Sequence, residues 1–231
     1  RSFPSVRVLR RENRGFAAAN NVALELARGR YVLLLNPDVE FAHGNLGELV
    51  AAMDARPETG IASVVQTDPD GTLQASIRRF PSVLRSLGEA LFSYHWPLGR
   101  GLQEPVAPGP SYERAGDADW MSGAFLIARA SAVAEVGPLD ERFFLYSEET
   151  DWCYRFNRAG WGDGRQGMIA THIVRAGRGR DGAGHFAEER RRAVLSAKVV
   201  VTFDLHLDGV LCAGDRVLRA DEALGRRGNL V

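Results

Sequence analysis

The stretch that decides the fold is Tyr31 to Asp38, which reads YVLLLNPD. Its first five residues form an unbroken apolar run, the pattern of a strand that is buried on both faces of a sheet. The Asn-Pro-Asp that follows ends the strand, because proline has no backbone N–H to donate to a neighbouring strand. The run therefore predicts the centre of a sheet that helices cover on both sides.

Strand and helix patterns alternate on either side of this run. The Ala-rich segment Gly15–Arg28, for example, predicts a helix that ends at Gly29. The other strands that we predict are Val6–Leu9, Gly60–Val65, Leu73–Arg78, Asp119–Ala128 and Met168–Val174, and the other helices are Leu46–Arg56, Ser82–Phe92, Ala130–Val136, Ser147–Ala159 and Phe186–Leu205. This order indicates an α/β fold with parallel pairing, in which ligands bind at the carboxyl ends of the strands.

Three segments are expected to be turns or loops. The turn signal at Thr67–Gly71 predicts that the strand after it returns as a hairpin. His95–Gly116 is rich in proline and glycine and has no periodicity, so we expect a mobile loop there. Arg175–Gly184 reads as a Gly/Arg loop.

Length, charge and cysteine content limit the class of protein that this chain can be. The chain has 231 residues, enough for one large domain or two small ones with a core that needs no disulfides. Lys+Arg and Asp+Glu both number 29, and a zero net charge argues against a nucleic-acid partner bound by a bulk positive field. Cys153 and Cys212 form no CxxC pair and fit a reducing compartment such as the cytoplasm. The apolar runs are far shorter than the ~20 residues of a membrane-spanning helix.

Asp38 is the first candidate for chemistry. It follows the end of a buried strand, where a carboxylate can hold a divalent cation beside a phosphate. The alternative is that Asn-Pro-Asp is only an Asx-type turn. The motif alone leaves both interpretations open.

The helix predicted from Ser147, with Ser147 as its N-cap, supplies the second candidate. Glu149 shares a face with Trp152, Cys153 and Phe156, so its carboxylate points along the buried face from the first turn, as a general base would. Acidic residues are also common in a first turn because they favour the helix dipole, and we assign that simpler role to Glu148. Asp151 and Arg155 are spaced as an i,i+4 surface ion pair.

Two further segments have both a functional and a structural interpretation. Ser122-Gly123-Ala124 would allow close approach of a ligand, or tight packing alone. The arginines Arg175, Arg178 and Arg180 could clamp phosphates, although such a run is more often a solvated loop.

Taken in order, several segments resemble family 2 glycosyltransferases of the GT-A fold, within them the bacterial rhamnosyltransferase-like branch that builds cell-surface polysaccharide. The similar segments are Asn13–Asn21 (NRGFAAANN), Tyr31–Asp38 (YVLLLNPD), Arg79–Pro81 (RFP), Ser122–Ala124 (SGA) and Leu139–Asp151 (LDERFFLYSEETD). Each segment is weak alone, but their order and spacing agree over roughly residues 5 to 177, and the ordered set is specific.

The resemblance implies a three-layer α/β/α domain with a mainly parallel mixed sheet, over residues 1–205, followed by a tail of unknown role at 206–231. It implies inverting transfer of a sugar from a nucleotide-diphosphate donor to a hydroxyl of a glycan or lipid-linked acceptor. Asp38 would be the ligand of Mg²⁺ or Mn²⁺, and Glu149 the base that deprotonates the acceptor. Donor or acceptor contacts would come from Asn13, Gly15, Asn20, Asn36, Ser122, Gly123, Ala124, Glu148, Asp151 and Arg175.

Two departures from the family pattern matter. The family's first strand–helix–strand, which holds the nucleotide, has no counterpart here, so we expect a fragment that starts at Arg1 rather than a complete domain. Val174-Arg175-Ala176-Gly177 stands where the family reads Val-His-His-Gly, and arginine cannot ligate a metal. We therefore hypothesise that Arg175 contacts the diphosphate directly and weakens the dependence on metal.

Other functions are also considered. A relative that lost its donor site would be a non-catalytic module that binds a sugar nucleotide or a partner. A nucleotidyltransferase has less support, because no Gly-rich phosphate loop followed by lysine is found. Lipid-linked acceptors would place the protein peripherally at the inner face of the plasma membrane. The basic start and apolar second half of residues 190–203 could lie on that surface, or could be a core-packed helix with a solvated end.

Overall fold

Tyr31–Leu35 forms β1, a strand whose five residues are all buried, as the apolar run predicts. The computed structural model describes residues 9, 12–36, 39–68, 70–90, 103–107, 109–113, 116–161, 168–178 and 199–203. The predicted strand Val6–Leu9 and the tail 206–231 lie outside these residues, apart from Leu9.

The main sheet has the strand order β2-β8-β3-β7-β1-β9, with β5 paired to β8 as well. Its strands are β1 (Tyr31–Leu35), β2 (Val39–His43), β3 (Ile61–Thr67), β5 (Gly116–Ala118), β7 (Phe125–Arg129), β8 (Met168–Arg178) and β9 (Val199–Phe203). A second, two-stranded sheet pairs β4 (Ile77–Arg78) with β6 (Trp120–Met121).

The predicted predominance of parallel pairing is wrong for the described strands. β3 and β8 pair in parallel, and the other described pairings of the main sheet are antiparallel. The reason is that β7 lies between β1 and β3 and runs against both of them. β1, β3 and β8 still point the same way, so their carboxyl ends lie along one edge of the sheet.

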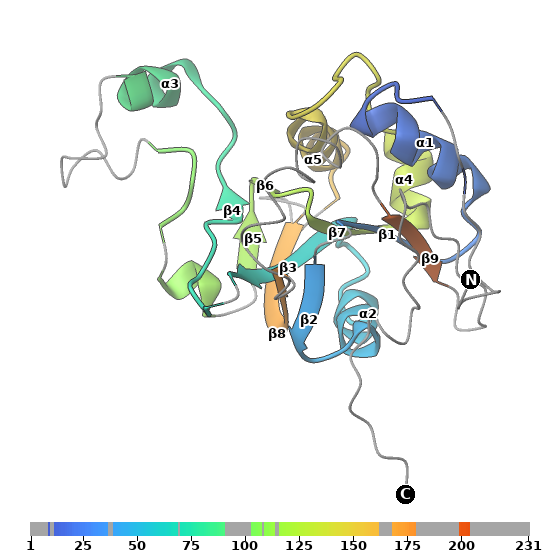
Figure 1. Ribbon diagram of the computed structural model, residues 1–231, viewed down its shortest axis with the longest axis horizontal. Helices are drawn as coiled ribbons and strands as arrows, with labels where there is room; N and C mark the ends of the chain where they lie inside the picture. The colour runs from blue at the N-terminus through green and yellow to red at the C-terminus, as the bar shows by residue number, and fades with distance from the viewer. Residues whose placement is uncertain are drawn as a thin grey trace, which may run out of the picture.

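Helices cover both faces of the sheet and give the predicted three layers (Figure 1). On one face lie α1 (Phe16–Leu26), α4 (Ala130–Val136) and α5 (Glu148–Arg158), and on the other lies α2 (Leu46–Asp54). β1 alternates between the two cores: Val32 and Leu34 belong to the α1/α4/α5 side, and Tyr31, Leu33 and Leu35 to the α2 side. A strand buried on both faces needs apolar residues at every position, which explains the unbroken run.

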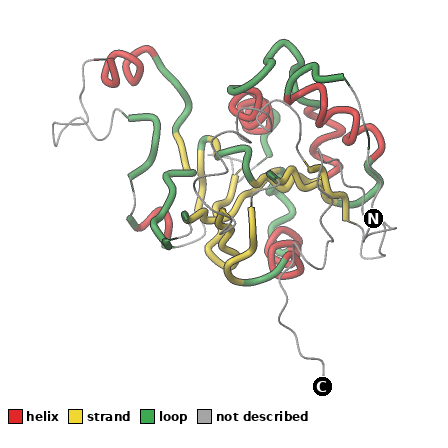
Figure 2. The backbone as a smooth tube through the Cα atoms, in the orientation of Figure 1, coloured by secondary structure: helices red, strands yellow, loops and turns green. Residues whose placement is uncertain are grey.

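The region between β3 and β7 differs from the sequence-based expectation. The turn after Thr67 forms, but the returning chain makes only a bridge at Leu73 before β4 joins the small sheet, so the predicted hairpin strand is mostly absent. The predicted strand Asp119–Ala128 is split, because Ser122–Ala124 turns the chain from β6 of one sheet into β7 of the other. α3 (Val83–Ala90) follows β4 and projects away from the layers (Figure 2).

The described part of the expected loop His95–Gly116 is anchored to the protein. Arg79 donates its backbone N–H to Glu104 at 2.8 Å, and Val106 donates to Ile77 at 2.9 Å. The short 3₁₀ helix η3 (Pro110–Tyr112) buries Tyr112, whose hydroxyl accepts from the backbone N–H of Ile77 at 3.0 Å. The buried ring and the hydrogen-bonded hydroxyl of Tyr112 fix this segment, although its proline and glycine content predicts a mobile loop.

Two predictions near the C-terminal end are wrong. β8 continues to Arg178, so Arg175 and Arg178 lie in a strand instead of a Gly/Arg loop. The predicted helix Phe186–Leu205 contains β9, which pairs with β1 along its full length. β-branched valines dominate β9, and they suit a strand better than a helix. The membrane-surface helix at 190–203 is therefore not supported at its apolar end. Within the part of the chain that the structure describes, no helix has the length and apolar character to cross a membrane.

Candidate active site

The carboxyl end of β1 meets the start of β7 at one edge of the sheet. Leu35 pairs with Phe125, and the backbone N–H of Asn36 donates to the carbonyl of Ala124 at 2.8 Å. Two segments far apart in the sequence, Asn36 and Ser122–Ala124, are therefore adjacent, as sites at strand ends require. The side-chain Oδ1 of Asn36 is buried and has no hydrogen-bond partner among the described residues.

Asp38 and Pro37 lie outside the described residues, but their flanks are placed. The backbone N–H of Val39 donates to the carbonyl of Asn36 at 3.2 Å, so the chain turns back at this point into β2. The turn follows the carboxyl end of β1 directly. Within the described residues no three His, Cys, Asp or Glu side chains gather as a metal site.

The N-terminus of α5 brings two glutamates to the same side of the molecule. α5 packs against β6, which leads directly into Ser122–Ala124. Glu148 is only 2% exposed, and Glu149 has a buried Oε2 without a hydrogen-bond partner in the described structure. Glu148 is thus more deeply buried than its assignment as a simple dipole partner implies.

Glu149 lies on the same face of α5 as the buried Cys153, which follows it by one helical turn. The pKa of the Cys153 thiol is raised to about 12, mainly by burial and in smaller part by the negative charge of Glu149. A backbone hydrogen bond from Met121 of β6 reaches the same cysteine. Glu149 therefore lies on the buried face of α5, toward β6, where the sequence pattern predicts it.

Asp151 has a structural partner. Its Oδ2 accepts from Arg155 Nε at 2.8 Å, which is the predicted i,i+4 ion pair. Arg155 also donates to the carbonyls of Val136 and Pro138, at 2.9 and 2.8 Å, and so ties α5 to the end of α4. The described contacts of Asp151 and Arg155 hold α5 in place.

The residues before α5 have an unusual backbone. Tyr146 and Ser147 have φ values of 69° and 71°, in the left-handed region that residues other than glycine seldom adopt. Ser147 occupies the predicted N-cap position but its side chain makes no capping hydrogen bond, because its backbone is not extended. Phe144 and Tyr146 are 52% and 70% exposed. Strained backbone and exposed aromatic rings beside the buried Glu148 and the half-buried Glu149 are typical of a ligand-binding segment.

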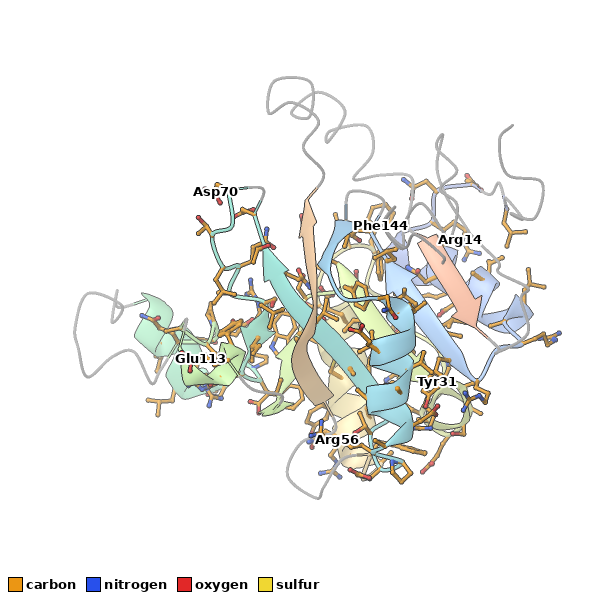
Figure 3. The ribbon with its side chains drawn as sticks, turned by 90° about the horizontal axis from the view of Figure 1, so that it is seen from below. Arg14, Tyr31, Arg56, Asp70, Glu113 and Phe144 are labelled. Carbon is orange, nitrogen blue, oxygen red and sulfur yellow. The ribbon has the colours of Figure 1, made fainter. Side chains whose placement is uncertain are left out.

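The segment 139–147 is fastened to α1 by the Asn13–Asn21 motif. Gly15, at φ +98°, allows its neighbour Phe16 to donate a backbone hydrogen bond to Phe144 at 2.9 Å. A Cβ at Gly15 would lie 2.5 Å from the carbonyl oxygen of Phe144. Figure 3 shows Phe144 beside Arg14 and far from Tyr31, which begins β1 at the other end of the sheet.

Asn21 makes the second connection, and sequence reasoning missed it. Its Nδ2 donates to the carbonyl of Leu139 at 2.8 Å, and its Oδ1 accepts from the N–H of Leu139 at 3.0 Å. Asn13 accepts from the N–H of Gly15 at 3.1 Å, and Asn20 donates to the carbonyl of Phe16 at 2.8 Å. The sequence does contain a signal for this contact: asparagine is a poor helix former, so its presence inside an Ala-rich helix indicates another role for its side chain.

Arg175 lies in β8, opposite His43 of β2 and Val65 of β3. Because β3 ends two residues later at Thr67, the backbone of Arg175 is near the carboxyl edge of the sheet. Its side chain lies outside what the structure describes.

The candidate site thus combines two glutamates at the N-terminus of α5, the strained residues before them and the turn that follows the carboxyl end of β1, within a layered α/β domain. Residues 1–103 match the family described as glycosyl transferase family 2. Residues 1–103 thus carry the sequence pattern of glycosyl transferase family 2, and the layered α/β arrangement of helices and strands fits that match.

Curated relatives agree with this family. The chain is 30% identical over 177 residues to N-acetylglucosaminyl-diphospho-decaprenol L-rhamnosyltransferase of Mycobacterium tuberculosis (strain ATCC 25618 / H37Rv), with 71% of this chain and 54% of the relative covered. It is 26% identical over 154 residues to rhamnosyltransferase WbbL of Escherichia coli (strain K12), covering 63% and 55% respectively. A solved structure of GalNAc-T7 with UDP, GalNAc and Mn²⁺ has a TM-score of 0.46 and 13% identity, covering 73% of this chain and 31% of that one. The chain spans about half the length of the two curated relatives.

Proposed function

We propose that this chain takes part in the inverting transfer of a hexose, such as rhamnose, from a nucleotide-diphosphate donor to a hydroxyl of a lipid-linked glycan. The observation that carries the proposal is the buried Oε2 of Glu149, without a hydrogen-bond partner in the described structure, on a helix that packs against β6, the strand leading into Ser122–Ala124. The rhamnosyltransferase relatives, one of them named for a decaprenol-linked acceptor, support the sugar and the lipid.

In the proposed reaction, Glu149 accepts the proton of the acceptor hydroxyl. The oxygen then bonds to the anomeric carbon from the side opposite the diphosphate, and the bond from that carbon to the diphosphate oxygen breaks with its electron pair. Inversion follows from this single displacement. A carboxylate oxygen without a hydrogen-bond donor is free to take the proton, which supports the role of Glu149.

Asp38 and Asn36 are the residues that would hold a divalent cation, Mg²⁺ or Mn²⁺. The buried Oδ1 of Asn36 fits this assignment, because an acceptor oxygen with no donor partner suits a hard cation. When bound, the cation would neutralise charge on the departing diphosphate. Asn36 and Ser122–Ala124 shape the edge of the sheet at which the donor would lie.

We further propose that Arg175 contacts the diphosphate, since its position near the carboxyl edge supports a role at the leaving group. A guanidinium there would share the neutralisation of negative charge with the cation. An enzyme with a lipid-linked acceptor would work peripherally at the inner face of the plasma membrane.

The experiment that tests the proposal compares Glu149→Gln with the native residue in the complete gene product. The assay would follow transfer of rhamnose from its nucleoside-diphosphate donor to a prenyl-diphosphate-linked N-acetylglucosamine. We expect turnover to fall by a factor of about 10²–10⁴ while donor binding is unchanged, because a general base contributes about that much. Glu25→Gln, on the exposed side of α1, is the matched control and should keep full activity.

Undiminished turnover of Glu149→Gln would contradict the assignment of the base. Absence of transfer by the native protein, together with tight binding of the sugar nucleotide, would instead indicate the non-catalytic binding module.

A further inference from the structure

Ser76 carries a buried hydroxyl that has no hydrogen-bond partner among the described residues. The residue is only 3% exposed, and its Oγ is enclosed by the protein. Buried hydroxyl groups in proteins are nearly always hydrogen-bonded, because burying one without a partner costs free energy. A hydroxyl that the surrounding chain leaves without a partner can form its hydrogen bond to a ligand instead.

The main chain fixes Ser76 beside the segment Ser122–Ala124. The carbonyl of Ser76 accepts a hydrogen bond from the backbone N–H of Ser122 at 3.1 Å. The pairing of β4 with β6 continues this contact, since Ile77 lies opposite Met121. Ser76 is therefore a direct neighbour of the segment along which the donor would lie.

The two ends of Ser122–Ala124 meet different parts of the proposed site. One end bonds to the backbone of Asn36, the proposed ligand of the cation at the diphosphate. The other end follows Met121, whose backbone contacts Cys153, one helical turn after Glu149. The transferred hexose has to lie between the leaving diphosphate and the base, because its anomeric carbon exchanges one bond for the other. A hexose in that position would extend along this segment.

Gln66 adds a second buried polar group at the same edge of the sheet. It is 4% exposed, and its Nε2 has no hydrogen-bond partner among the described residues. Backbone hydrogen bonds connect it to Ser76, because Gln74 donates to the carbonyl of Gln66 at 2.9 Å and Ser76 donates to the carbonyl of Gln74 at 2.8 Å. An amide and a hydroxyl with unused hydrogen-bonding capacity suit a ligand that carries several hydroxyl groups.

We propose that the hydroxyl of Ser76 forms a hydrogen bond to a ring hydroxyl of the transferred hexose and thereby helps to select the donor sugar. This inference rests on the proposed transfer of a hexose. Ser76 orients the sugar ring in this assignment, while Glu149 takes the proton of the acceptor. A site built to bond a sugar hydroxyl discriminates against a sugar that lacks it, because the buried group of the protein is then left unpaired.

The test compares Ser76→Ala with the native serine in transfer by the complete gene product. The donors are nucleoside-diphosphate rhamnose and analogues of it that each lack one hydroxyl of the rhamnose ring. We expect Ser76→Ala to lower kcat/KM for the rhamnose donor about tenfold, since one buried hydroxyl of the sugar loses its partner. With the analogue that lacks the bonded hydroxyl, the two proteins should have equal kcat/KM, a result that a purely structural role of Ser76 does not produce. Ser86→Ala removes an exposed hydroxyl from α3 and is the matched control, which should keep the native kcat/KM with every donor.

The stability of the protein without ligand distinguishes a ligand contact from a structural one. Because the hydroxyl of Ser76 has no partner among the described residues, its removal should leave the midpoint of urea unfolding unchanged or raise it. A clear fall in the midpoint for Ser76→Ala would show that this hydroxyl already bonds within the fold, and would overturn the inference.

The remaining outcomes separate the inference from the proposed function. A loss of kcat/KM that is equal for every donor analogue would overturn the hydrogen bond to the sugar. A change confined to the KM of the acceptor would assign Ser76 to the acceptor and would also overturn the inference. Absence of transfer by the native protein would refute the proposed function alone. Calorimetric binding of nucleoside-diphosphate rhamnose would then test Ser76, with about tenfold weaker binding by Ser76→Ala expected and equal binding overturning the inference.

Discussion

At the scale of single residues, Gly15 stands at a position where the structure leaves no room for a Cβ. Its φ of +98° belongs to a region that only glycine occupies readily, and a Cβ would meet the carbonyl oxygen of Phe144 at 2.5 Å. We expect Gly15→Ala to lower the free energy of unfolding by about 3 kcal/mol, from backbone strain and overpacking together. Because the displaced segment leads into Glu148 and Glu149, transfer activity should fall as well.

Gly71→Ala is the matched control for this substitution. Gly71 has a similar φ of +87°, but nothing lies within 4 Å of its Cβ position. Its replacement should cost only the strain, about 1–2 kcal/mol, and leave activity unchanged. Equal losses of stability in urea unfolding of the two variants would show that the contact with Phe144 has no energetic role.

Cys153 illustrates how burial decides the chemistry of a residue. Burial raises the pKa of its thiol to about 12, so at neutral pH the thiol stays protonated and unreactive. In a Cys212→Ser background we expect iodoacetamide to leave the folded protein unlabelled at pH 8, and to label it fully in denaturant. The thiol of the unfolded chain ionises near the ordinary cysteine pKa of 9.0, so the free energy of unfolding should fall as the pH rises above 9. Rapid labelling of the folded protein would contradict the burial.

At the scale of elements, Asn21 joins α1 to the segment that precedes α5. Its amide satisfies both the N–H and the C=O of Leu139, which are buried in the described structure. Asn21→Ala would leave both groups unpaired and should destabilise the protein by about 2–4 kcal/mol. Hydrogen exchange should accelerate in 139–147. Asn45→Ala, which removes the exposed cap of α2, should cost about 1 kcal/mol without that local effect.

The helices that carry their own start and stop signals were predicted closely from the sequence. Ala130–Val136 has the predicted bounds, and α1, α2 and α5 differ at their ends by a few residues. The strands were harder, because an apolar run does not say which neighbour it will pair with. The insertion of β7 between β1 and β3, and the pairing of β9 with β1, are long-range choices of this kind.

In the candidate site, too, local features could be predicted from the sequence and long-range contacts could not. The position of Glu149 on the buried face of α5 followed from helical periodicity, a local property. The contact between Asn36 and Ala124 and the two bonds between Asn21 and Leu139 join distant segments, and no local pattern contains them. The exposed apolar residues of α3 break the rule that apolar faces point inward, and for that reason a sequence pattern reads α3 as an ordinary core helix.

At the scale of the whole molecule, the directions of the strands bring several of the predicted site residues to one edge of the sheet. β1, β3 and β8 end on that edge, and β7 begins there, so Asn36, Ser122–Ala124 and the backbone of Arg175 lie along it although they are far apart in the sequence. An edge built by several strands can divide the neutralisation of a diphosphate among several groups. The loss of activity when metal is removed would therefore measure how much of the diphosphate charge the cation neutralises and how much Arg175 neutralises.

We expect the complete gene product to keep a residual part of its transfer activity in excess chelator, because the guanidinium of Arg175 would still face the leaving diphosphate. Arg175→Ala should be active with Mg²⁺ at a reduced rate and lose the residual activity when the metal is removed. Arg28→Ala, at an exposed position just after the end of α1, is the control and should behave like the native protein. Complete inhibition of the native enzyme by chelator, with an Arg175→Ala variant that is unaffected in Mg²⁺, would assign the whole of that charge to the cation and none of it to the strand.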